Sequence, residues 1–164
     1  MSGNESTETA APPAKKTAVL VLGCPQVPVQ TSVALYLVDR LSHAGITPVI
    51  AGNKAAITLL VVADPKRYYL KEVMDLDRAV AQISDKKRDF DLCFVFIHND
   101  AGVSYAATMA AISKATIFPV IYGEHWEEMA AQITFPCTKI AAKAVHNPLP
   151  LKKIIDEVTS SWVA

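Results

Sequence analysis

The sequence predicts a three-layer α/β/α sandwich with a mostly parallel, Rossmann-like sheet of five or six strands. From Thr17 onward, short apolar and β-branched runs alternate with longer segments of helical periodicity, which is the pattern of strands joined by crossover helices. The apolar runs are continuous, as expected for strands that are buried on both faces. The chain has 164 residues, which suits one domain over residues 17–164.

The expected strands cover residues 17–23, 46–52, 67–73, 90–98, 116–123 and 137–145. The third of these is at most a brief edge strand. With it, the expected strand order is 3-2-1-4-5-6, and without it a five-stranded 2-1-3-4-5 sheet results. Both orders place the end of the first strand beside the end of residues 90–98.

The expected helices cover residues 32–45, 53–65, 75–87, 101–115, 125–133 and 150–162. Thr31 or Ser32 can cap the first helix, Gly45 ends it, and Asp100 is a natural N-cap for the fourth. Residues 53–65 are compatible with a strand, but their alanine and leucine content favours a helix.

Composition excludes several classes of protein. Sixteen basic and 16 acidic side chains give a formal net charge of zero, so the basic excess of a nucleic-acid binder is missing. The longest aliphatic stretch, AAITLLVVA, falls well short of the roughly 20 residues that span a bilayer. Residues 1–16 are polar, resemble no signal peptide and are expected to form a disordered tail. Three cysteines without CxxC spacing indicate reduced thiols and a cytoplasmic protein.

Three histidines and one cysteine follow predicted strands directly. Cys24 follows the first strand, and His98, His125 and His146 end or follow the last three. Because ligands bind outside the carboxyl ends of parallel strands, these positions predict a site at that edge of the sheet. His43 lies near the end of a helix, where the helix dipole favours a cation, and is expected to be structural.

The first loop, GCPQVPVQTS, argues against two common nucleotide sites. It contains neither GxGxxG nor GxxxxGK[ST], and Pro25 and Pro28 lack the amide donors that would bind phosphate. No particular cofactor is therefore predicted. Cys24 is interpreted either as a small apolar filler or as a thiolate that a helix N-terminus or an imidazolium stabilises. Cys93 and Cys137 are expected in the core.

The loop IHNDAGVSYAA carries the strongest site prediction. His98, Asn99 and Asp100 follow one another, and Gly102 would leave room for a ligand to approach free helix amides. Cys24, His98 and Asp100 are the candidate catalytic residues. The candidate ligand-binding residues are Gly23, Cys24, Gln26, His98, Asn99, Asp100, Gly102, Ser104, Glu124, His125, His146 and Asn147. No HxxxH or HExxH spacing indicates a metal site.

The segments GCPQVPVQTS, FDLCFVFIHNDAGVSYAATMAAI and AAKAVHNPLPLKK together resemble a small uncharacterised α/β family of methanogenic archaea. The resemblance runs from about Thr17 to the C-terminus. It implies a cytoplasmic three-layer protein that could form a homodimer, and it carries over no catalytic residue. The plan is also similar to that of corrinoid-binding domains, but their Asp-x-His-x-x-Gly signature is missing.

These observations lead to one main hypothesis and two others. The main one is a protein that binds a small anionic or nucleotide-like ligand at the carboxyl edge of the sheet, with thiol or imidazole chemistry as an option. The alternative is a non-catalytic subunit or adaptor, since the helix GVSYAATMAAISKA has many small residues that permit close packing. A thiol-dependent enzyme is the third. Neither a nucleic acid nor a membrane is expected as a partner.

Overall fold

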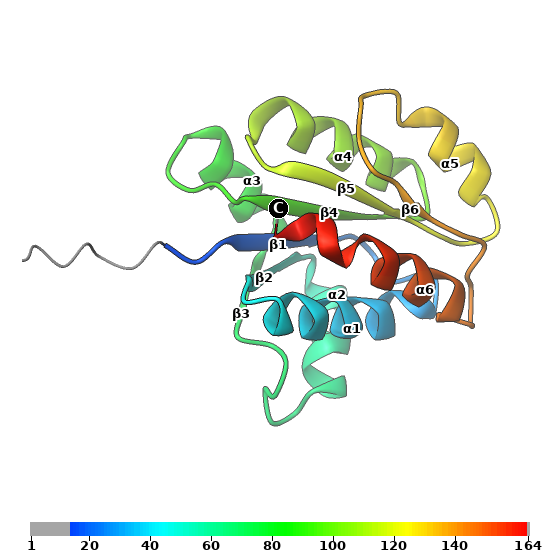
Figure 1. The fold of residues 1–164 in the computed structure, drawn as a ribbon, viewed down its shortest axis with the longest axis horizontal. Coiled ribbons are helices and arrows are strands. Elements are labelled where there is room, and N and C mark those ends of the chain that lie inside the picture. Colours follow the sequence, from blue (N-terminus) through cyan, green and yellow to red (C-terminus); the bar gives the residue numbers. More distant parts are fainter. Residues whose placement is uncertain (1–13, 164) are drawn as a thin grey trace, which may run out of the picture.

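A computed structural model describes residues 14–163, which form a six-stranded parallel sheet with helices on both faces (Figure 1). The strand order is β3-β2-β1-β4-β5-β6. The predicted sandwich and the order 3-2-1-4-5-6 are therefore confirmed, and the five-stranded alternative is wrong. The strands are β1 (Thr17–Leu22), β2 (Thr47–Gly52), β3 (Glu72–Asp75), β4 (Leu92–Ile97), β5 (Thr116–Ile121) and β6 (Ile140–Ala141).

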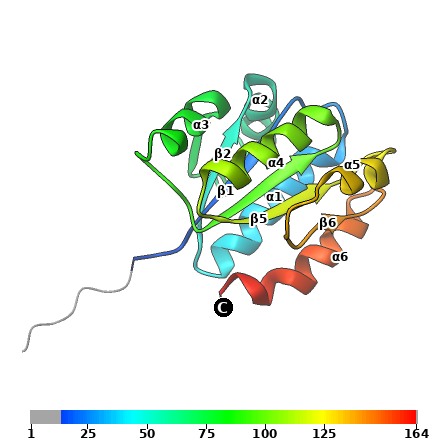
Figure 2. The same cartoon turned by 90° about the horizontal axis from the view of Figure 1, so that it is seen from above.

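The helices divide evenly between the two faces of the sheet. They are α1 (Val29–His43), α2 (Lys54–Ala63), α3 (Leu76–Ser84), α4 (Asp100–Ile112), α5 (Trp126–Gln132), α6 (Leu149–Val158) and the 3₁₀ helix η1 (Thr159–Trp162). One face carries α1, α2 and α6, and the other carries α3, α4 and α5 (Figures 1 and 2). Alternate side chains of the central strands point to opposite faces and fill both cores.

The larger core contains a cluster of aromatic rings that ties the end of the chain to the sheet. Phe94 of β4 stacks on Phe118 of β5, with ring centroids 5.0 Å apart. The ring of Trp162 meets Phe94 edge-on at 5.3 Å and is fully buried. Burial of such large rings is a major source of stability, so η1 is an integral part of this core.

Two helix starts differ from the sequence prediction. α1 begins at Val29 with Pro28 at its N-cap, so Thr31 and Ser32 lie inside the helix and do not cap it. Proline suits this position because the first helical amides have no partner within the helix. Asn99, and not Asp100, caps α4, and its side-chain oxygen accepts a hydrogen bond from the amide of Gly102 at 3.2 Å.

The third strand starts later than predicted because a buried carboxylate turns the chain before it. Asp64 is 4 % exposed, and its two oxygens accept hydrogen bonds from the amides of Tyr68, Tyr69 and Leu70 at 2.8–2.9 Å. These amides are therefore not available for pairing with β2. Burial raises the pKa of Asp64, but the three backbone hydrogen bonds outweigh it and hold the pKa below its usual range.

The sequence predicted the end of α1 correctly but overestimated the length of β6. Gly45 adopts a φ of +76° and ends α1 as predicted. β6 is only two residues long, although residues 137–145 were expected to be strand.

Cys93 is buried and Cys137 half-buried, and all three cysteines are free. Of the predicted tail, residues 1–13 lie outside the described part of the chain. None of the helices within residues 14–163 is long and apolar enough to cross a membrane.

Gly102 permits the close contact between α4 and β4. A Cβ atom at this position would lie 2.9 Å from Cα of Ile97 and 3.0 Å from the carbonyl oxygen of Phe96. Both neighbours are backbone atoms that cannot move independently. The space that was predicted to admit a ligand is therefore filled by the protein's own strand.

We expect Gly102→Ala to lower the free energy of unfolding by roughly 1–3 kcal/mol through overpacking. This loss should appear although alanine favours a helix over glycine by about 1 kcal/mol. Urea denaturation measures the change. The control is Ala107→Gly on the exposed side of the same helix, which should lose only about 1 kcal/mol. A Gly102→Ala protein as stable as the parent would contradict the close contact.

Candidate functional site

A shallow groove lies at the carboxyl edge of the sheet, where β4 and β5 end and α4 and α5 begin. Its volume is about 230 Å³. It is lined by His98, Asn99, Asp100, His125, Glu128 and Met129. The strands run toward this edge, at the right of Figure 1. The structure thus brings together four of the predicted ligand-binding residues, from two different loops.

A chain of buried hydrogen bonds supports His98 from beneath. The Nε2 of Gln30 donates to the carbonyl oxygen of Gly23 at 3.0 Å. The hydroxyl of Tyr122 donates to Oε1 of Gln30 at 2.5 Å. The same hydroxyl lies 3.3 Å from Nδ1 of His98. Gln30 and Tyr122 are only 2 % and 1 % exposed, so their polar atoms depend on these bonds.

The direction of this chain determines the tautomer of His98. The Gly23 carbonyl can only accept, which orients the Gln30 amide so that its Oε1 faces Tyr122. The single hydroxyl proton of Tyr122 is donated to Oε1 of Gln30. In its contact with Nδ1 of His98, the hydroxyl oxygen of Tyr122 is therefore the acceptor. Nδ1 of His98 therefore carries a proton, and neutral His98 has its free lone pair on Nε2.

The surroundings favour the neutral imidazole. Burial lowers the pKa of His98 below 6.5, because a charged ring loses hydration there. Burial also raises the pKa of Tyr122, so the phenol remains a donor. Asn99 uses its side-chain oxygen to cap α4 and turns Nδ2 toward Nε2 of His98 at 3.5 Å. That distance marks a weak contact, and Nε2 keeps capacity to bind another donor.

Carboxylates supply the fixed charge of the groove. Asp100 lies in the first turn of α4, and Glu128 in the first turn of α5. Oε1 of Glu128 is 3.6 Å from Nδ1 of His125, and both side chains are 72 % exposed, so this pair is weak. The lining residues include neither lysine nor arginine. The groove is therefore acidic.

Comparison with known proteins identifies the family. The sequence family described as "Domain of unknown function (DUF1890)" matches residues 19–158. The chain belongs to this family. The uncharacterized protein MJ0452 of Methanocaldococcus jannaschii is 32 % identical over 148 residues, which cover 87 % of this chain and 97 % of that protein.

A solved structure supports the fold of this DUF1890 protein independently. The structure of MT0777 superposes with a TM-score of 0.81 and 32 % identity, and the match covers 89 % of this chain and 98 % of the other. The predicted resemblance to an uncharacterised archaeal family is thus confirmed. Neither the family description nor the names of these relatives state an activity, so the function depends on the chemistry of the site itself.

The candidate catalytic residues Cys24, His98 and Asp100 form no hydrogen bonds with one another in the part of the chain that the structure describes. Cys24 and Gln26 are exposed on the loop after β1, and Cys24 does not line the groove. Within residues 14–163, the Cys24 thiol forms no hydrogen bond or ion pair. Asp100 likewise forms no hydrogen bond to His98. A catalytic role for these residues stays a prediction.

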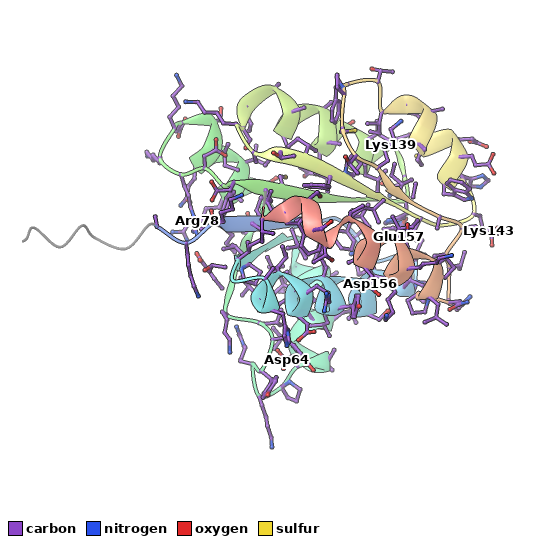
Figure 3. All side chains as sticks on the ribbon, viewed as in Figure 1. Asp64, Arg78, Lys139, Lys143, Asp156 and Glu157 are labelled. Carbon is purple, nitrogen blue, oxygen red and sulfur yellow. The ribbon has the colours of Figure 1, made fainter. Side chains whose placement is uncertain are left out.

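The outer candidates make local contacts of their own. Glu124 pairs with Lys143 at 3.7 Å, and Lys143 is labelled at the right of Figure 3. Asn147 accepts a hydrogen bond from the amide of Leu149 at 3.1 Å and orders the start of α6. Ser104 and His146 are exposed. These residues therefore lie at the rim or outside the groove.

Two further observations bear on metals and on the histidine in α1. His43 is exposed and contacts the backbone oxygen of Asp39 at 3.0 Å, which agrees with the structural role predicted for it.

In the described part of the chain, no three histidine, cysteine, aspartate or glutamate side chains come together as metal ligands.

Gln30 and Tyr122 were missed by sequence reasoning. Gln30 is a polar residue directly before the apolar stripe of a helix, and Tyr122 directly follows the aliphatic end of a strand. Their bond links positions 92 residues apart, which no local pattern reveals. Glu128 and Met129 were also missed as lining residues, because an acidic first turn is explained by the helix dipole alone.

We expect Tyr122→Phe to lower the free energy of unfolding by roughly 1–3 kcal/mol, because Oε1 of Gln30 loses its partner while buried. The variant should also gain the Nε2–H tautomer of His98. Chemical denaturation and imidazole ¹⁵N chemical shifts measure the two effects.

Tyr105→Phe is the matched control, since its hydroxyl donates no hydrogen bond within residues 14–163. Its stability should stay within about 0.5 kcal/mol of the parent. Nitrogen shifts that place the proton of parental His98 on Nε2 would contradict the directed chain.

Proposed function

We propose that this protein binds a small polar molecule in the groove at the carboxyl edge of β4 and β5, with Nε2 of His98 as the principal hydrogen-bond acceptor. The supporting observation is the buried chain from Gly23 through Gln30 and Tyr122. It holds the imidazole in one tautomer and places its lone pair on Nε2, whose contact with Nδ2 of Asn99 is long and weak at 3.5 Å. Binding sites depend on polar groups that are oriented in advance in this way.

Charge and size narrow the ligand class. The sequence predicted a small anionic or nucleotide-like ligand. Asp100 and Glu128 would repel an anion, so a neutral or cationic molecule with an N–H or O–H donor fits this groove better. The groove measures about 230 Å³, below the roughly 300–1,000 Å³ of typical ligand pockets. A small amine, amide or amino alcohol meets both conditions.

Imidazole chemistry is compatible with this proposal. A neutral histidine whose free nitrogen faces a bound donor can accept its proton, as a general base does. Tyr122 would stabilise the resulting imidazolium through the oxygen that accepts the Nδ1 proton. Because Cys24 lies outside the lining, thiol chemistry forms no part of the proposal.

Thermal unfolding with a panel of small amines, amides and amino alcohols tests the groove. A ligand at one hundred times its Kd stabilises the folded state by about 2.7 kcal/mol. We expect that gain in the parent and its loss in His98→Asn. His146→Asn is the control, since it removes an exposed strand-end histidine outside the groove. An equal response of His98→Asn to the same compound, or a preference for acetate and phosphate, would overturn the proposal.

A subunit or adaptor role is the second candidate, and one surface favours it. Four of the six large apolar side chains that are exposed within residues 14–163 come from α2 and the loop after it. Leu59, Val62, Tyr68 and Tyr69 are 44 %, 72 %, 76 % and 39 % exposed. Apolar surface gathered in this way marks interaction sites. Asp64, labelled in Figure 3, orders the backbone beneath the two tyrosines.

The double substitution Val62→Ser and Tyr68→Ser should abolish an assembly that uses this surface. Light scattering measures the mass in solution and so detects the homodimer that the family resemblance implies. Affinity purification from the native source detects other partners. Thr58→Ala, an exposed change on the same helix, should alter neither. Assembly that survives the double substitution would exclude this surface.

A further inference from the structure

A second hollow lies at the opposite edge of the sheet and has the opposite charge. It is formed by the loop between α3 and β4 and the loop between α4 and β5, and its volume is about 380 Å³. Its charged lining residues are Lys86, Lys87, Arg88, Asp89 and Lys114. In Figure 1 the loop after α3 lies at the left end of the molecule, away from the carboxyl edge.

The acidic residue of this hollow is engaged by the protein itself. Asp89 accepts hydrogen bonds from the amides of Phe90 at 2.9 Å and Lys114 at 2.8 Å, and from the hydroxyl of Ser113 at 2.5 Å. Burial raises its pKa, but these bonds and the positive charge of Lys114 outweigh that effect and hold the pKa below its usual range, so Asp89 keeps its negative charge. Asp89 therefore ties the two loops together and makes the walls rigid.

Arg88 is also engaged. Its guanidinium forms two hydrogen bonds with Glu72, at 2.6 and 2.9 Å, and lies over the ring of Phe90 at 4.9 Å. The paired Arg88 and Glu72 neutralise each other. Lys86, Lys87 and Lys114 are exposed, and their three positive charges outnumber the single negative charge of Asp89, so the hollow is positive. Within residues 14–163 none of the three lysines forms an ion pair.

The backbone at Lys86 is an independent observation. Its φ is +57°, in the left-handed region that glycine occupies at most helix ends of this kind. The amides of Lys86 and Lys87 donate to the carbonyls of Ile83 and Gln82 at 3.0 and 2.9 Å, which is the Schellman arrangement. A lysine here is strained, whereas glycine would satisfy the turn without strain. The helix dipole favours a cation at this end, but it does not require one at the strained position.

We propose that this hollow binds a small phosphate-bearing ligand, with a nucleotide as the best-fitting class. Lysine ammonium groups from two rigid loops would bind the phosphate oxygens as point charges. Ile112, a half-buried residue that also lines the hollow, offers apolar contact to the organic part. The volume of about 380 Å³ falls within the roughly 300–1,000 Å³ of ligand pockets. The sequence predicted a nucleotide-like ligand at the carboxyl edge of the sheet. The positive charge that such a ligand requires lines the hollow at the opposite edge.

Titration calorimetry with ADP, tripolyphosphate and adenosine tests this proposal on the full-length chain. We expect ADP to bind saturably, tripolyphosphate more weakly, and adenosine without phosphates not at all. Backbone chemical shifts should change at residues 83–89 and 112–114, and not at residues 98–100. Affinity should fall as salt is added, because the contacts are ionic.

Two variants and a control make the test decisive. Lys86→Gly removes the ammonium while relieving the backbone strain, so it should stay folded and be at least as stable as the parent. It should weaken ADP roughly five- to tenfold, and Lys87→Ala should act similarly. Lys153→Ala removes an exposed lysine from α6 and should leave the affinity unchanged.

Three results would overturn the proposal. The first is no saturable ADP binding up to about ten millimolar, well above the range of useful ligand affinities. The second is a loss of affinity in Lys153→Ala that equals the loss in Lys86→Gly, which would indicate a general charge effect. The third is binding that strengthens steadily with the length of an RNA oligonucleotide, which would assign the lysines to a nucleic-acid surface.

Discussion

The hydrogen bond between Gln30 and Tyr122 is the contact on which the geometry of the carboxyl edge depends. Through it the loop after β1, the first turn of α1 and the ends of β4 and β5 share one continuous set of donors and acceptors. A buried polar pair of this kind is expensive to leave incomplete. The same bond that holds α1 against the sheet therefore also determines which nitrogen of His98 carries the proton.

The zero net charge of the chain conceals a difference in charge between the linings of the two hollows. The groove where β4 and β5 end is lined by Asp100 and Glu128 and by neither lysine nor arginine, whereas the hollow where these strands begin is lined by four basic side chains and Asp89. The helix dipoles favour this distribution at both edges. The dipoles do not explain why Asp89 is hydrogen-bonded and Arg88 ion-paired within the protein while the neighbouring lysines are left exposed, or why Lys86 occupies a glycine conformation. Each edge therefore suits a different class of small molecule.

The sequence predicted the sheet well because parallel strands buried on both faces are continuous apolar runs. It also placed His98, Asn99, Asp100 and His125 at one edge, since the direction of each strand follows from the alternation with helices. Features that depend on contacts between distant residues were beyond it. The contact between His98 and Tyr122 is one such feature. The position of Lys86 and Lys114 in the lining of one hollow is another. The prediction of the exact helix starts was also wrong, because neighbouring residues such as Asn99 and Asp100 are equally able to cap the N-terminus of a helix.

The turn beneath the two exposed tyrosines has a consequence for local motion. Surface loops usually exchange their amide protons with solvent quickly, because opening them breaks few contacts. Here one buried carboxylate, Asp64, holds the amides of Tyr68, Tyr69 and Leu70 together, so releasing any one of them exposes an incompletely bonded charge. These amides should open as a single unit. We therefore expect the apolar surface formed by Tyr68 and Tyr69 to move with the rest of the molecule and not as a flexible loop.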